Sequence, residues 1–262
     1  MKGILISLQA EALKIYRSRV FWVSIAFFAF VPCMMGLLMF VQKNPEIASR
    51  LGMIGTKSTM VRFGEPNWSN YLILISESVA AIGLIGYGFV TAWSFGREYT
   101  DHTIKDILSL PVPRGSIVMA KFAAITLWSI LLSFVFLLVA LLIGKVIQLT
   151  GWSDEVILHS LLKFAITSLL TILLLPPVAF FACYGKGVLL PMGFVILTLL
   201  MANFTGLVGL GPYFPWAIPG IFSTTGGAGG PGLFPVSYII LITTGLAGLA
   251  STLAWWQFAD HK

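Results

Sequence analysis

Charged side chains, the residues best suited to chemistry in this sequence, are concentrated in residues 96–121. Of the 16 basic and 10 acidic residues in the chain, seven lie there: Arg97, Glu98, Asp101, Lys105, Asp106, Arg114 and Lys121. The stretch lies between two apolar runs, each long enough to cross a bilayer. We interpret it as the main polar loop of a membrane protein, placed to contact something at the membrane surface.

A short amphipathic helix is predicted within this loop. Thr100 or Asp101 can cap its start with a side-chain oxygen. Apolar residues then recur at helical spacing and would form one stripe, at Ile104, Ile107, Leu108 and Pro111. Pro111 and Pro113 end the helix, because proline disfavours helical geometry in the residue before it. Such a helix could bind a partner, or it could lie flat on the lipid surface.

Patterns typical of enzymes, nucleotide-binding proteins and channels are absent from the sequence. It has no G-x-x-x-x-G-K-[ST] loop to hold ATP, no H-E-x-x-H zinc motif and no G-x-S-x-G elbow. The histidines His102, His159 and His261 are isolated, so no metal site is expected. Rows of basic residues and repeated filter sequences, typical of voltage sensors and selective pores, are also missing. The sequence therefore predicts a protein that is not itself an enzyme.

Composition places most of the chain in lipid. Of 262 residues, 58% are hydrophobic and 10% are charged, with a mean hydropathy of +0.94. A soluble domain is about 25% charged. The net charge of +6 is explained by membrane orientation and anionic headgroups, so nucleic acid is not expected as a partner. Cys33 and Cys183 both lie in apolar runs and are expected to be packing residues.

The apolar runs predict an all-α membrane protein, with six transmembrane helices in a single domain that covers residues 1–262. The spans are expected at about residues 20–41, 71–95, 122–144, 158–184, 188–210 and 236–258. Pro32 should kink the first span, and the pair Pro176-Pro177 should bend or break the fourth. Residues 2–19 are expected to form an amphipathic interfacial helix. This helix either clasps the bundle or a partner, or it is an anchor lying on the lipid.

The distribution of Lys and Arg predicts the orientation of the protein. Counted by side, ten lie on the side that carries both termini and the 96–121 loop, and six lie on the other. The richer side is cytoplasmic, so both termini are expected in the cytoplasm and the protein in the plasma membrane. The first outer loop, residues 42–70, is itself basic, so the difference in the number of Lys and Arg between the two sides is only moderate.

Two features on the outer side are candidates for ligand binding. Glu77 is the only acidic residue within an expected span, and it lies about two turns from the outer end of its helix. It could bind a cationic substrate, carry a proton, pair with a basic residue of the outer loop, or be solvated at the interface. Residues 211–234 carry no charge and include Tyr213, Phe214 and Trp216. We expect them to dip into the membrane interface.

Small residues repeat every four positions on two of the expected helices. They are Gly88, Ala92 and Gly96 on one helix and Thr244, Gly248 and Thr252 on the other. Such stripes permit close helix contact, either within the chain or between two copies. The pattern itself does not decide between these alternatives.

The loop motif resembles the first cytoplasmic loop of ATP-binding-cassette (ABC) type-2 permeases. The family pattern is Arg-Glu-x-x-x-x-Thr, an apolar stripe ending in Leu-x-x-Pro-x-x-Arg, and a Lys at the head of the next span. Here it is met by Glu98, Thr103, Leu108, Pro111, Arg114 and Lys121. The likeness is strongest to the short six-span members linked with export of, or immunity to, bacitracin and lantibiotics. The N-terminal helix and residues 213–219 resemble the family's connecting helix and outer hairpin.

This resemblance implies the permease half of a transporter. Two copies would associate with two copies of a separate ATPase subunit that binds Mg-ATP, and this chain would hold no cofactor itself. Residues 98–114 would form the coupling helix, seated in a cleft of the ATPase. The residues implied at that interface are Glu98, Asp101, Thr103, Ile104, Lys105, Ile107, Leu108, Pro111, Arg114 and Lys121. The candidates for the substrate path are Glu77, Tyr213, Phe214 and Trp216.

An antimicrobial peptide or an amphipathic drug is the substrate that the charge-poor spans and the aromatic outer segment favour. Export is favoured over import because most of the family exports. The alternative is a six-span membrane protein that serves as a regulatory or signalling partner of a cytoplasmic ATPase without transport of its own. Transport that depends on Glu77 or on the outer hairpin would distinguish the two.

Overall fold

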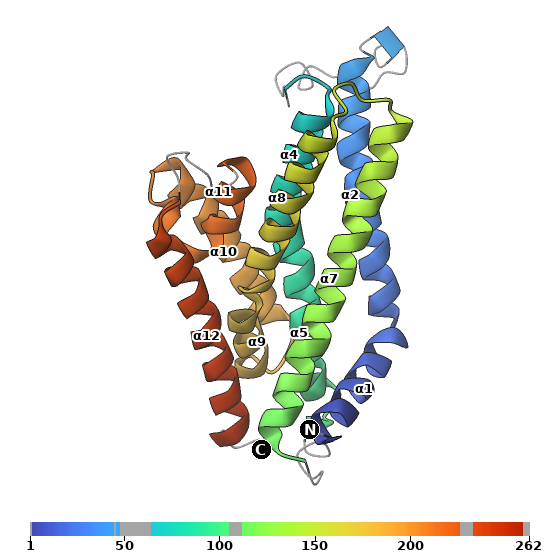
Figure 1. The fold of residues 1–262 in the computed structure, drawn as a ribbon. Helices are drawn as coiled ribbons and strands as arrows, with labels where there is room; N and C mark the ends of the chain where they lie inside the picture. Colours follow the sequence, from blue (N-terminus) through green and yellow to red (C-terminus); the bar gives the residue numbers. More distant parts are fainter. Residues whose placement is uncertain (1, 45, 48–63, 105–111, 226–232, 259–262) are drawn as a thin grey trace.

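The described part of the chain is all-helical, as predicted. In the computed structural model it comprises residues 2–44, 46–47, 64–104, 112–225 and 233–258 (Figure 1). Six helical segments are long and apolar enough to cross a membrane: Arg19–Lys43, Trp68–Thr100, Arg114–Val146, Asp154–Tyr184, Leu189–Leu207 and Pro235–Phe258. Length and composition therefore confirm the six expected membrane-spanning helices.

Four of these spans are single helices, and two are interrupted. The single helices are α2 (Arg19–Lys43), α7 (Arg114–Val146), α10 (Leu189–Leu207) and α12 (Pro235–Phe258). The second span consists of α4 (Trp68–Ser78), a π-helical turn η1 (Val79–Gly83) and α5 (Leu84–Thr100). The fourth consists of α8 (Asp154–Ile172) and α9 (Leu175–Tyr184), and α1 (Lys2–Tyr16) precedes all of them.

Local hydrogen bonds explain where two of the helices begin and end. The Ser18 hydroxyl accepts the backbone N–H of Phe21 at 3.2 Å and caps the start of α2. Helix α5 continues beyond its expected end through Thr100, whose hydroxyl donates to the Gly96 carbonyl at 3.2 Å. Asp101 is the C-cap of α5. The prediction that Thr100 or Asp101 caps the start of a new helix is therefore wrong.

Prolines set several boundaries. Helix α8 ends at Ile172 and α9 begins at Leu175, with proline in its first turn, where the missing N–H has no helical partner to lose. The break predicted at Pro176-Pro177 is thus confirmed. Pro113 immediately precedes α7, which begins at Arg114, eight residues before the expected start of the third span. Pro32 lies inside α2, and the helix continues through it.

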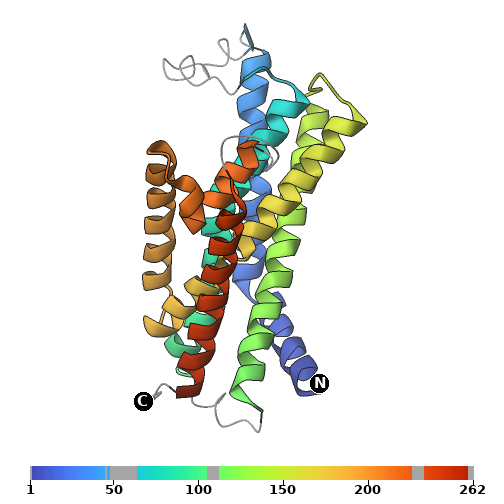
Figure 2. The same cartoon turned by 60° about the vertical axis from the view of Figure 1, so that its left-hand side comes forward.

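The helices pack into one bundle around α7 and α9. Helix α7 contacts α1, α2 and α12, whereas α9 contacts α5, α10 and α12 (Figures 1 and 2). Two glycines of the predicted stripes lie at such contacts. A Cβ at Gly96 would meet the backbone of Gly187, and one at Gly248 would meet the backbone of Pro177. At these positions the small residues serve close packing within the chain.

The described part of the charge-free aromatic segment, residues 211–225, forms short helical turns at the ends of α10 and α12 that lie away from α1 (Figure 1). Two 3-10 turns, Gly211–Tyr213 and Pro215–Ala217, lead into α11, Ile218–Thr225. Ile218 and Phe222 are buried where α11 packs against α8 and α4. The segment is too short to span a bilayer, which agrees with the expectation that it does not cross it.

Helix α1 packs along the base of α7. Ile15 belongs to the hydrophobic core, and Glu11 is buried beside it on the same helix. Leu13 and Tyr16 are exposed. Of the two alternatives for this helix, the structure therefore has α1 clasping the bundle of its own chain.

Candidate functional site

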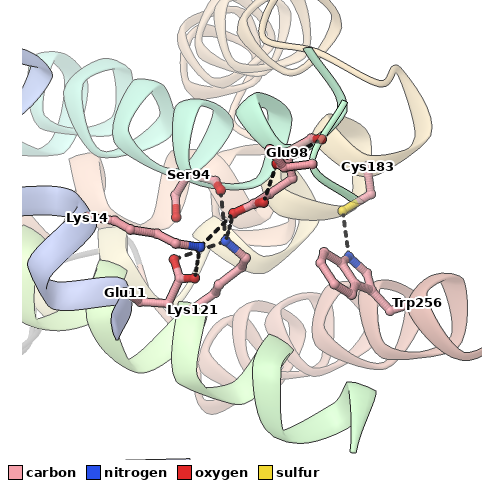
Figure 3. A network of polar contacts seen from close by, with 8 residues as sticks. Glu11, Lys14, Ser94, Glu98, Lys121, Cys183 and Trp256 are labelled. Atoms are coloured by element: carbon pink, nitrogen blue, oxygen red, sulfur yellow. Dashed lines mark hydrogen bonds and ion pairs between the residues drawn. The ribbon is translucent and has the colours of Figure 1, made fainter. Parts of the chain in front are cut away.

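Four charged side chains form a network where α1, α5 and α7 meet, and three of them are buried while Lys14 is half-buried (Figure 3). At its centre is Lys121, near the start of α7, whose side chain is fully buried. The Lys121 Nζ lies 2.7 Å from Glu98 Oε1 and 3.0 Å from Glu11 Oε2. It also donates to the Ser94 carbonyl at 3.3 Å. One ammonium group therefore joins all three helices.

Glu98 connects this network to the polar loop. Its side chain is 2% exposed, and its second carboxylate oxygen accepts the Thr103 hydroxyl at 3.0 Å. Thr103 lies in the turn that follows α5, in which His102 adopts a left-handed backbone conformation with φ of 55°. Ile104, the next residue, is buried. The turn that enters the loop is thus held against the bundle by Glu98.

Lys14 completes the network from α1. Its Nζ lies 2.8 Å from Glu11 Oε1 and 3.4 Å from Glu98 Oε1. Burial alone would lower the pKa of Lys14, but the hydrogen bonds and charges of Glu11 and Glu98 outweigh it, and the pKa is raised above its usual value. Lys14 therefore stays charged at neutral pH. Two lysines then balance two glutamates, and the network has no net charge.

A balanced network of this kind fixes the relative positions of the helices but adds little net free energy to the stability of the fold. Desolvating four charges costs free energy, which their attraction and hydrogen bonds only offset when every partner is present. Removing one partner leaves a buried charge without compensation, which typically costs 3–5 kcal/mol. Each of the four charged groups is paired with another from a different helix or turn, so the arrangement acts as a joint between the helices.

The structure corrects the placement of two residues predicted on the partner-facing loop. Glu98 and Lys121 are buried inside the bundle and are bonded to each other. They precede and follow the loop, and their ion pair closes it at its base. Asp101 is exposed, and Thr103 is half-buried. The other predicted contacts, Lys105, Ile107, Leu108 and Pro111, lie outside the described residues.

Arg114 also makes contacts within the chain. Its Nη1 donates to the carbonyl oxygens of Trp256 and Gln257, both at 3.3 Å. These carbonyls belong to the last turn of α12, where a cation is favoured by the helix dipole. Arg114 is exposed, so its guanidinium also borders the loop surface. A hydrogen bond from the Trp256 indole to Cys183 Sγ, at 3.2 Å, joins the same end of α12 to α9 (Figure 3).

The candidates at the opposite end of the bundle are only partly brought together. Glu77 and Trp216 line one cavity of about 420 Å³. Tyr213 and Phe214 are not among the residues that line it, although the Phe214 ring packs on Trp216 at 5.6 Å. Glu77 is half-buried, and Lys163 of α8 interacts with it electrostatically.

Sequence reasoning missed four residues of these two sites. Glu11 and Lys14 lie on the polar side of the amphipathic helix expected at residues 2–19, and a Glu and a Lys three residues apart are usually an ordinary surface pair. Lys163 and Asn203 were not singled out. The one available indication for Lys163 is that it is a basic residue within an expected span. Among the described residues, no three His, Cys, Asp or Glu side chains are grouped to hold a metal ion.

Comparison with known proteins defines the class of protein to which this chain belongs. Residues 7–203 match the family model described as ABC-2 family transporter protein. The match covers more than half of the chain, and the chain belongs to this family of transporter membrane proteins. It is a multi-pass, non-catalytic membrane subunit, the permease of an ABC transporter, and this class implies an ATPase partner.

A characterised relative gives a more particular likeness. The chain is similar to the bacitracin transport permease protein BCRB of Bacillus licheniformis. The two are 27% identical over 203 residues, which cover 76% of this chain and 94% of the relative. The resemblance inferred from the loop motif is therefore confirmed at the level of the family, and the link to bacitracin rests on a distant relative.

Proposed function

We propose that this chain forms the translocation path of an exporter for an antimicrobial peptide or an amphipathic drug, driven by a separate ATPase that binds Mg-ATP. Two copies of the permease would assemble with two copies of the ATPase. Membership of the ABC-2 family supports the division of labour, and the similarity to a bacitracin permease supports the substrate class. Both ends of the chain and the 96–121 loop would face the cytoplasm, because that side carries more Lys and Arg.

The proposed mechanical coupling between the loop and the membrane spans is supported by one observation. The Glu98–Lys121 ion pair joins the end of α5 to the start of α7, the two helices between which the loop leaves and re-enters the bundle. A force applied to the loop would therefore move α5 and α7 together and not spread them. Because Lys121 also holds Glu11, α1 would follow the same motion.

In this proposal the loop segment between Asp101 and Arg114 is seated in the ATPase. Ile107 and Leu108 would provide the apolar contact, and Asp101 and Arg114 a charged rim that fixes register more than affinity. Glu98 and Lys121 would act behind that surface and transmit its displacement. Closure of the ATPases on Mg-ATP would then tilt the spans and open the path outward.

Drug susceptibility tests the proposed export function. Cells that lack this chain are expected to become several-fold more sensitive to bacitracin or a lantibiotic. The wild-type chain should restore resistance only beside an ATPase whose phosphate-binding lysine is intact. Unchanged susceptibility across bacitracin, lantibiotics and cationic amphipathic drugs would contradict export of these substrates.

A further inference from the structure

A cavity of about 420 Å³ lies between the second span, α10 and α11. Its volume lies within the range of small-molecule binding sites. Most of its lining is apolar or small. The polar side chains among its lining residues are Glu77, Asn203 and Ser223, with the indole of Trp216 beside them. Glu77 is the only charged side chain among them.

The carboxylate of Glu77 has free acceptor capacity. It makes no salt bridge and no hydrogen bond to any described residue, although its side chain is half-buried. A partly desolvated carboxylate is costly unless a cation or donor faces it. Lys163 is the cation that interacts with it electrostatically, but its ammonium donates to the Thr224 carbonyl at 3.0 Å and does not line the cavity. The carboxylate is thus available to a cation that enters the cavity.

The cavity also has an aromatic wall that is held in place. Trp216 packs edge-on against Phe194, with ring centroids 5.3 Å apart, and against Phe214 at 5.6 Å. Its indole N–H is buried without an acceptor among the described residues. A fixed indole beside a carboxylate can bind a cation through its ring face and the adjoining alkyl groups through apolar contact. This combination recognises molecules with a cationic end and an apolar body.

The backbone beside Glu77 makes room for such a ligand. The π-helical turn Val79–Gly83 follows directly after α4, and its Ala80 and Ala81 line the cavity with methyl groups only. Single π-helical turns inside helices are frequently found at functional sites. Gly220 on the facing α11 has no neighbour within 4 Å of an added Cβ. Small residues on both walls therefore leave the carboxylate accessible.

Building on the export function proposed above, we propose that this cavity binds the cationic end of an amphipathic molecule, with Glu77 as its counter-ion and Trp216 as its aromatic wall. The charge of Lys163 acts on Glu77 without a direct contact, and it would repel the cation of the ligand. Loss of one charge should therefore affect binding in the opposite direction from loss of the other. Removing Glu77 weakens cation binding, whereas removing Lys163 strengthens it.

Binding of the cationic dye rhodamine 6G to the full chain in phosphatidylcholine nanodiscs tests this inference. Fluorescence anisotropy is measured against empty nanodiscs, and dodecylamine and uncharged dodecanol are compared as competitors. Glu77→Gln, which keeps the shape of the side chain, is expected to raise Kd about tenfold, the loss of roughly one charge pair. Lys163→Gln is expected to lower Kd, and dodecylamine is expected to displace the dye far better than dodecanol.

Glu155→Gln is the matched control, because Glu155 is an exposed acidic residue at the same end of the bundle and does not line the cavity. Its Kd should equal that of the wild type. A wild-type Kd in Glu77→Gln, an equal loss in Glu155→Gln, or a weaker dye complex in Lys163→Gln would overturn the inference. If the dye binds independently of Glu77 while an ATPase still co-purifies, the cavity assignment fails and the permease assignment stands. If the dye binds as expected but no ATPase co-purifies, the cavity assignment stands and the proposed ATPase-driven export fails.

Discussion

The ammonium group of Lys121 lies 2.7 Å from the carboxylate of Glu98, although the two residues are 23 positions apart in the sequence and the polar loop lies between them. This contact joins the end of α5 to the start of α7 inside the bundle. Glu11 from α1 shares the same ammonium at 3.0 Å. The loop of this ABC-2 permease is therefore anchored at its base to three helices at once.

Removing Lys121 should destabilise the bundle. Lys121→Met leaves Glu11 and Glu98 with Lys14 alone, and we expect a loss of about 3 kcal/mol in the free energy of unfolding. Lys145→Met, on the same helix, removes an exposed ammonium 5.9 Å from the Trp152 ring centroid and should change it by less than about 1 kcal/mol. Thermal unfolding of both variants in detergent measures the difference. Equal melting temperatures of the two variants would contradict the predicted destabilisation by loss of Lys121.

Glu11 should control the docking of α1. Glu11→Gln removes the charge that pairs with Lys121 and Lys14, so α1 is expected to separate from α7 more often. Hydrogen–deuterium exchange should accelerate in α1 and stay unchanged in α10. Arg17→Gln, which removes an exposed charge directly after α1, serves as the control. Equal exchange in both variants would contradict the role of Glu11.

Gly248 should be intolerant of a methyl group. A Cβ there would meet the backbone of Pro177, which cannot move without shifting α9, and Gly248→Ala is expected to cost about 2 kcal/mol. Gly193→Ala should instead be neutral or stabilising by up to about 1 kcal/mol, because no atom lies within 4 Å of its Cβ. Thermal unfolding distinguishes the two. A neutral Gly248→Ala would mean that α9 and α12 are packed less closely than described.

Arg114 should protect the end of α12. Arg114→Gln removes the charged donor to the carbonyls of Trp256 and Gln257, so amide exchange in the last turn of α12 is expected to rise about threefold, for a local loss of roughly 0.5–1 kcal/mol. Lys186→Gln, in the exposed turn between α9 and α10, should leave this exchange unchanged. Unchanged amide exchange in Arg114→Gln would show that Arg114 does not stabilise the end of α12.

The positions of the membrane-spanning helices could be predicted from the sequence, but the charged contacts between the helices could not. Apolar runs of bilayer length and the Pro176-Pro177 pair determine the spans and the break before α9 locally, so their positions could be predicted. The partner of Glu98 could not, because Lys121 and Glu11 approach it only after three helices have packed. A carboxylate next to a polar loop is ordinarily a surface residue, and only burial distinguishes it from one.

Glu77 illustrates the same limit at the other end of the bundle. Its position within a span made it a functional candidate from the sequence. Four readings remained open, because the side chains that face it come from α8, α10 and α11. The structure places it in the same cavity as Trp216, where the charge of Lys163 also acts on it. Tyr213, adjacent in the same aromatic segment, is exposed instead.

Co-purification of an ATPase subunit from native membranes tests the central claim most directly. The affinity-tagged chain is expected to retain an ATPase near a 1:1 ratio, with Mg-ATP hydrolysis in the purified sample. The double variant Ile107→Asp/Leu108→Asp should insert normally and lose the ATPase, whereas Lys186→Asp, in the exposed turn between α9 and α10, should keep it. Loss from the double variant alone is the predicted result. Retention of the ATPase by the double variant would contradict coupling through this loop, and purification of the wild-type chain without any ATPase would contradict the proposed transporter.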